Sequence, residues 1–177
     1  MAQSSYGTYL LKYDATASGY KKVIDIIDYS DLEEQPETID TTTLSDDTET
    51  NIAGIKRLGS GISCSVLVVP TEFLALRAVA EAHTVNEYVL LFKNAPLTAD
   101  ANGVVTNFTP DTTGSTANAD FAVYFDASIS IVQNGAGVDE ALKATLTLYP
   151  QGKDYTITVD NATVKVRRVM SYIAPTH

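Results

Sequence analysis

The chain has 177 residues but no tryptophan, one cysteine, two histidines and only 12 lysines and arginines. A single cysteine excludes an intramolecular disulfide framework. The shortage of cations, with a sequence pI of about 4.5, excludes the basic stripe with which proteins grip nucleic-acid phosphates. No run of 18 apolar residues occurs, so we expect no transmembrane helix. The first residues also lack the basic and apolar regions of a secretory signal.

Few side chains are suited to catalysis or metal binding. Cys64 alternates with Ile62 and Val66, so it is expected to be a small core residue. His83 lies near a predicted helix end, and His177 is expected to be frayed. No cysteine or histidine pair has zinc spacing, and residues 46–49 lack the spacing of a calcium loop. We therefore predict a protein that is not an enzyme, with no catalytic, metal-binding or cofactor-binding residues.

Acidic residues are concentrated in one segment. Residues 23–55 hold ten of the 22 carboxylates and no lysine or arginine, so the rest of the chain carries 12 residues of each sign. The whole formal net charge of −10 therefore belongs to this segment. Such self-repulsion lowers the stability of a monomer. Isoleucines and leucines recur within the segment, which disfavours simple disorder. We interpret it as a segment used by a partner rather than as a disordered charge run.

The sequence pattern predicts one mainly β domain (α+β class) over residues 1–177. Strands are predicted at residues 9–13, 22–28, 37–44, 61–69, 86–94, 121–132, 140–149, 155–159 and 163–169. Residues 71–83 predict one amphipathic helix with Thr71 as its N-cap, and Asn102-Gly103 predicts a hairpin turn. Helices do not alternate with strands, so we expect two packed antiparallel sheets, sandwich-like or barrel-like, flanked by the helix.

Two further segments are expected to carry assembly contacts. Residues 45–57 show no regular period and form a predicted long loop, a kind of segment that often carries function. Residues 154–177 form a predicted basic hairpin and tail. The hairpin offers a candidate basic surface at Lys165, Arg167 and Arg168. We hypothesise that part of the acidic segment packs against these cations in a neighbouring subunit.

The outward sides of several predicted strands carry small polar residues. They are Asp40, Thr42, Ser63, Ser65, Asp126, Ser128, Ser130, Thr145 and Thr147. One interpretation is an ordinary solvated sheet face. The other is a smooth, weakly anionic wall past which a polyanion moves without sticking. Both interpretations remain open at this point.

The stretch that starts at residue 41, TTTLSDDTETNIAGIKRLGSGISCSVLV, resembles the major tail proteins of long, non-contractile-tailed bacteriophages. The corresponding residues are Thr43, Leu44, Ser45, Asp46, Ile52, Gly54, Ile55, Leu58 and Gly59. The helix that opens near Thr71 and residues 129–153 are similar to the family in order and spacing. Ala53 stands where proline is frequent in the family. The resemblance does not extend to the residues after Asp154.

The resemblance implies a tail tube protein that is made in the bacterial cytoplasm and resides in the virion tail. Its subunits would form hexameric rings stacked into a hollow tube around a tape-measure protein. Tail terminator and distal tail proteins would be further partners, and double-stranded DNA would pass through the lumen without specific binding. The long loop, with Leu44, Ser45, Asp46, Asp47, Ile52, Gly54 and Ile55, would reach a neighbouring subunit or ring.

Two alternative functions stay open. The chain could be a tube or connector subunit of a related contractile injection machine. It could also be a surface-binding or carbohydrate-binding β-sandwich, which belongs to a different class of protein. That class is expected to show aromatic clusters in loops, whereas the ten tyrosines here are scattered through strands.

Overall fold

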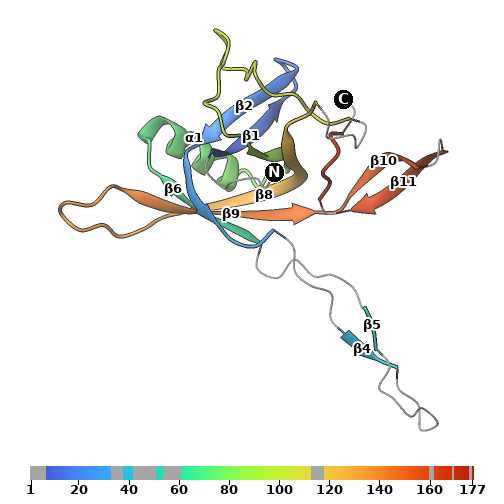
Figure 1. The fold of residues 1–177 in the computed structure, drawn as a ribbon. Coiled ribbons are helices and arrows are strands. Elements are labelled where there is room, and N and C mark those ends of the chain that lie inside the picture. The colour runs from blue at the N-terminus through green and yellow to red at the C-terminus, as the bar shows by residue number, and fades with distance from the viewer. Residues whose placement is uncertain are drawn as a thin grey trace.

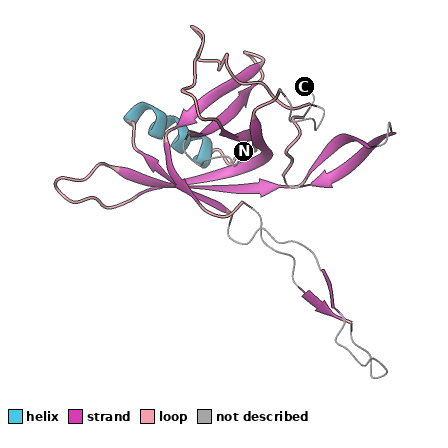
Figure 2. Ribbon diagram, in the orientation of Figure 1, coloured by secondary structure: helices cyan, strands magenta, loops and turns pink. Residues whose placement is uncertain are grey.

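The fold is built on one seven-stranded antiparallel sheet (Figure 1). A computed structural model describes residues 7–32, 38–41, 51–53, 61–112, 118–159, 162–168, 170–175 and 177. In sheet order, the strands are β2 (Gly19–Ile24), β1 (Thr8–Asp14), β7 (Asn86–Phe92), β8 (Phe121–Gln133), β9 (Lys143–Gln151), β6 (Ile62–Leu67) and β3 (Ile26–Tyr29). Figure 2 shows the helix α1 (Pro70–Glu81) beside these strands. The described part of the chain is therefore mainly β with one helix, as the sequence predicts.

The two edge strands of this sheet are consecutive in the chain. β2 and β3 lie at opposite ends of the sheet order, yet only Asp25 separates them. Every neighbouring pair in the sheet is antiparallel, so β2 and β3 run in the same direction. Together they form one bent strand that pairs with β1 at its start and with β6 at its end. The sheet must therefore curl round into a barrel-like shape.

This closure corrects the expectation of two packed sheets. The described residues show one curled seven-stranded sheet, and no second sheet packs face to face against it within them. Residues 22–28, predicted as one strand, are divided at Asp25 between two neighbours. The carbonyl oxygen of Asp25 accepts a hydrogen bond from the amide of Leu67 at 3.1 Å, which is where the chain reaches β6.

The main core fills the inside of the curled sheet, under α1. Phe73 and Leu76 of the helix are buried against inward residues of β6, β7, β8 and β9. The helix begins two residues earlier than predicted. Its N-cap is Val69, with no side-chain hydrogen bond, and Pro70 takes the first helical position, so Thr71 is not the cap. Proline suits that position because its fixed φ is helical and its missing N–H is not needed there.

A second core lies on the outer face of the same sheet. Its buried members are Leu11, Tyr20, Val89, Leu91, Val105, Ala122, Tyr124 and Ala174. Residues 97–111 and 170–175 cover it, and the backbones of Tyr124 and Ser171 exchange two hydrogen bonds of 2.7 and 2.9 Å. The covering loop turns at Asp100, whose carboxylate accepts bonds from the amides of Asn102 and Val104. The first half of β8 is consequently buried on both faces.

Two short ladders are separate from the seven-stranded sheet. β4 (Thr38–Asp40) pairs with β5 (Asn51–Ala53), and β10 (Lys153–Val159) pairs with β11 (Ala162–Arg168). Three residues of the predicted loop over residues 45–57 thus form a strand. Figure 1 shows both ladders standing away from the barrel. Two-stranded ladders are marginally stable in water, so such elements are expected to gain from a further contact.

Candidate assembly surfaces

Hydroxyl side chains form rows across three neighbouring strands. Thr147 on β9 lies opposite both Ser63 on β6 and Ser130 on β8, and Thr145 lies opposite Ser65. Ser63 is exposed and the other four are partly buried. Their neighbours in sequence, such as Cys64, Leu146 and Ile129, point into the main core. The structure therefore brings these predicted residues together on one outward face, which we call the hydroxyl face.

The hydroxyl face continues along β8 and β9. Ser128 lies opposite Tyr149, Asp126 lies opposite Gln151, and Val132 lies opposite Thr145. Tyr149, Gln151 and Val132 were not predicted as members, because only the register between strands places them there. In these three strands Lys143 is the only cation, and it lies at the end of the face opposite Leu67. The face is thus small, polar and nearly free of positive charge.

Side chains of strand β3 and of Ser30, which directly follows it, extend this face. The Ser30 hydroxyl accepts a hydrogen bond from the amide of Ser63 at 3.0 Å. The Asp28 carboxylate accepts one from the amide of Ser65 at 3.3 Å. Asp28 also lies directly opposite Ser65 in the register, so its charge belongs to the same face. Sequence reasoning missed this member, because the bulge in β3 changes which residues point outward.

Much of the predicted long loop lies outside the described residues. This applies to Thr42, Leu44, Ser45, Asp46, Asp47, Gly54 and Ile55. Of the remaining predicted residues nearby, Ile52 lies in β5 opposite Ile39, and Asp40 lies in β4 opposite Asn51. Their roles in a loop contact and in a lumen wall stay predictions.

The predicted basic surface lies on one strand. Lys165, Arg167 and Arg168 are all in β11, and Lys165 is exposed. In the register Lys165 lies opposite Thr156, Arg167 opposite Asp154 and Arg168 opposite Lys153.

Neither Cys64 nor His83 lies in a group of residues suited to metal binding within the described ranges. Cys64 is fully buried in the main core, as predicted, and burial raises the pKa of its thiol to about 12. His83 is exposed and follows α1 with a positive φ of 51°, and its amide bonds to the Ala80 carbonyl oxygen. Within the described ranges, no three His, Cys, Asp or Glu side chains are grouped so that they could hold a metal ion.

A polar cluster that the sequence did not reveal holds His177 in place. Its ring stacks on Tyr13 with centroids 3.7 Å apart, and its Nε2 lies 3.2 Å from an oxygen of Glu87. The Tyr20 hydroxyl donates to the same Glu87 oxygen at 2.8 Å. Burial, followed by the charge of Glu87, raises the pKa of Tyr20 above its ordinary value. His177 is therefore packed, which corrects the expectation that it is frayed.

No model of a known protein family matches the chain, and no curated protein matches it either. In the part of the chain that the structure describes, no helix is long and apolar enough to cross a membrane.

Proposed function

We propose that this protein is a structural subunit of a bacteriophage tail tube, which self-assembles into stacked rings around a conduit for DNA. The observation that carries the proposal is the hydroxyl face. It spans three adjacent strands, and the sequences of those strands hold one cation among their residues. A wall of this kind offers phosphates few charged partners, because affinity for DNA comes mainly from lysine and arginine contacts.

Two further features support a subunit of an assembly. The β4–β5 and β10–β11 ladders each have two strands and stand away from the barrel. The net charge of −10 is concentrated in residues 23–55, while β11 carries cations. Both features are costly for an isolated monomer and are accounted for if neighbouring subunits cover the ladders and pair the charges.

In this proposal the hydroxyl face lines the lumen, and the tape-measure, terminator and distal tail proteins are the further partners. The ladder β4–β5 and the residues around it contact neighbouring subunits or rings. The protein acts without a cofactor, and its contact with DNA is transient and independent of base sequence.

Electron microscopy of the purified protein tests the proposal directly. We expect negatively stained samples to contain hollow tubes or ring-shaped assemblies, and light scattering to show a mass that grows with protein concentration. Image averages of end-on rings then give the subunit number. A protein that stays monomeric over the whole concentration range, also when mixed with its tape-measure protein, would overturn the proposal.

A further inference from the structure

The hairpin that joins β8 to β9 projects from the barrel as an arm, residues 134–142 (Figure 1). Every residue from position 132 to 143 is exposed, and Val138 near the end of the arm is fully exposed. The amide of Asn134 donates a hydrogen bond to the Lys143 carbonyl oxygen at 3.0 Å, which closes the base of the arm. The arm therefore presents an uncovered valine away from the barrel.

The end of the arm is a closed, acidic turn. The amide of Glu140 donates to the Gly137 carbonyl oxygen at 3.3 Å, and the Gly137 amide donates to the Glu140 carboxylate at 3.0 Å. Val138 and Asp139 lie between them, and their amides donate no hydrogen bond within the described residues. The turn thus offers an apolar side chain, a carboxylate and two amide donors in a shape that is already formed. Such a shape loses little conformational entropy on binding.

A pocket of about 340 Å³ has the complementary chemistry. It lies between the first turns of α1 and the strands β1, β2 and β7. Its apolar wall includes Leu76, which is buried, and Val23 and Val79, which are partly buried. Its charged lining residues are Lys12, Lys21, Lys22 and Glu72. The pocket is therefore apolar inside, and three of its four charged residues are lysines.

Two of the charged residues in the pocket lack a partner. Lys21 and Lys22 are each paired with a carboxylate of the chain itself, at 2.7 and 2.5 Å. Lys12 forms no ion pair or hydrogen bond through its ammonium within the described residues. One oxygen of Glu72 is buried there and accepts no hydrogen bond, which is costly for a carboxylate. An occupant with an acceptor for Lys12 and a donor for Glu72 would satisfy both.

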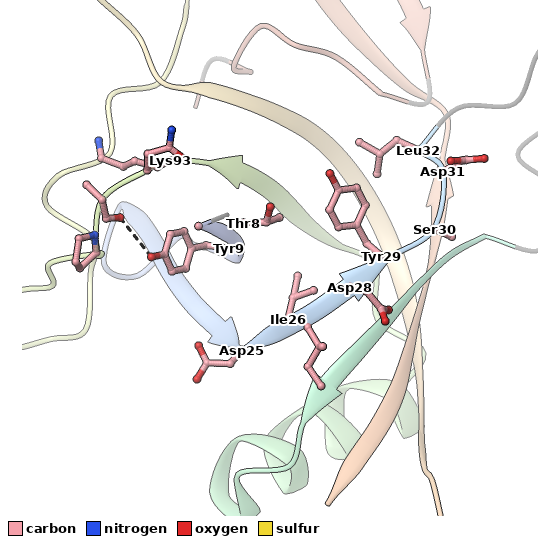
Figure 3. A pocket seen from close by; sticks show the side chains of 15 residues that line it. Thr8, Tyr9, Asp25, Ile26, Asp28, Tyr29, Ser30, Asp31, Leu32 and Lys93 are labelled. Carbon is pink, nitrogen blue, oxygen red and sulfur yellow. Dashed lines mark hydrogen bonds between the residues drawn. The ribbon is translucent and has the colours of Figure 1, made fainter. Parts of the chain in front are cut away.

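A larger groove, of about 1070 Å³ beside β3, is a poor match for the arm (Figure 3). Asp25, Asp28 and Asp31 line it. The one lysine among its lining residues, Lys93, donates to both oxygens of Asp120 at 2.9 Å. This groove thus offers negative charge, which repels an acidic turn.

The arm that fits the pocket belongs to a second copy. Within one chain Val138 is fully exposed, so the arm does not occupy the pocket of its own chain. Arm and pocket are different surfaces of each copy, so each copy gives its arm to one neighbour and its pocket to another. Contacts of this kind generate rings or open stacks rather than closed pairs, as a tube of many subunits requires.

We propose that the end of the arm of one copy inserts into the pocket beside α1 of a second copy. Val138 enters the apolar part of the pocket, the Asp139 carboxylate pairs with Lys12, and the amides of the turn donate to Glu72. Lys12 lies on the side of β1 that faces α1, so the contact brings no cation to the hydroxyl face. The inference rests on the proposed function, because it names a contact through which subunits join. A single pocket buries much less than the roughly 1,200 Å² of a stable complex, so it acts together with other subunit contacts.

Cysteine cross-linking between two variants tests the contact. Ala141→Cys places a thiol beside the turn and Ala75→Cys places one at the pocket, both at exposed positions, while the native Cys64 is buried. The two proteins are mixed under assembly conditions and treated with a short bismaleimide. We expect a covalent dimer that forms only when both variants are present, because docking holds the two thiols at a high effective concentration.

The matched control uses Ile27→Cys, an exposed position in the larger groove, in place of Ala75→Cys. It should give at least about tenfold less dimer, because its thiol is not held near the arm. Equal yields from both mixtures, or no dimer in either, would overturn the inference.

Charge exchange gives an independent readout on the whole chain. Asp139→Lys and Lys12→Glu should each lower the assembled fraction in sedimentation by about tenfold, and the two combined should restore it. The control is Glu81→Lys, an exposed position at the other end of α1, and it should assemble normally. An unchanged urea midpoint by circular dichroism shows that each variant is folded. Normal assembly of the folded Asp139→Lys protein, or no recovery in the combined variant, would contradict the contact.

The two proposals fail in different ways. If wild-type protein forms tubes but the cross-link is absent and the charge variants assemble normally, the contact is wrong and the tube function stands. If wild-type protein forms no tube or ring but the cross-link appears in small oligomers, the contact is right and the tube function is wrong.

Discussion

At the scale of single residues, the Tyr20 hydroxyl connects the second core to His177 through Glu87. It donates to Glu87 at 2.8 Å, and Glu87 in turn contacts His177. We expect Tyr20→Phe to lower the free energy of unfolding by about 1.5–3 kcal/mol, the range for hydrogen bonds to charged groups. Urea unfolding measures the loss. Tyr9→Phe is the control, because its hydroxyl makes an exposed 3.3 Å bond to the Ala95 carbonyl oxygen. Equal losses in both variants would contradict the stabilising role assigned to the hydrogen bond between Tyr20 and Glu87.

The thiol of Cys64 offers a second test at this scale. Burial raises its pKa from 9.0 to about 12, and the side chain has no exposed surface. Each unit of pKa lowers the thiolate fraction about tenfold, so near pH 8 the native thiolate is reduced by about 10³-fold. We expect a water-soluble thiol reagent to label the native protein very slowly and the urea-unfolded protein rapidly. Fast labelling of the folded protein would show that the main core is open at Cys64.

At the scale of elements, α1 should contribute to the free energy of unfolding through one side only. Leu76 is 5% exposed and packs in the main core, whereas Leu74, two residues earlier, is 64% exposed. We expect Leu76→Ala to lower the free energy of unfolding by about 2–5 kcal/mol, the usual cost of a large-to-small core substitution. Leu74→Ala is the matched control and should stay within about 0.5 kcal/mol of the wild type. Both are measured by urea unfolding, and similar values for the pair would mean that the helix is packed differently.

The elements also show what local sequence can and cannot predict. The spacing of Phe73 and Leu76 predicts the helix, because a period of 3.6 residues is a local property. The alternation in β8 predicts its inward face, but Ala122 and Tyr124 on the other face are buried as well. The segments that cover them, residues 97–111 and 170–175, are distant in sequence, and nothing in β8 itself indicates their arrival. The same reason explains why the packing of His177 was missed.

At the scale of the whole molecule, the sequence predicts the class but not the closure. A mainly β chain with one helix follows from composition and period. The curled sheet depends on residues 22–28, which have the pattern of one ordinary strand. The change of partner at Asp25 has no sequence signal, because it is decided by where β1 and β6 come to lie. The rows of the hydroxyl face likewise become visible only with the register.

Lysines placed on the hydroxyl face should hinder the passage of DNA. Replacing Ser63, Ser128 and Ser130 by lysine should leave tube formation intact and slow DNA release from virions built with the variant. Each added lysine can contact a phosphate and release a counterion, so the slowing should weaken as salt rises. Asp126 is left unchanged, so that the variant adds positive charge without removing a carboxylate. The control adds three lysines at exposed positions of α1, Thr71, Leu74 and Ala78, and should release DNA normally. Normal release from the hydroxyl-face variant in intact tubes would mean that this face does not line the conduit.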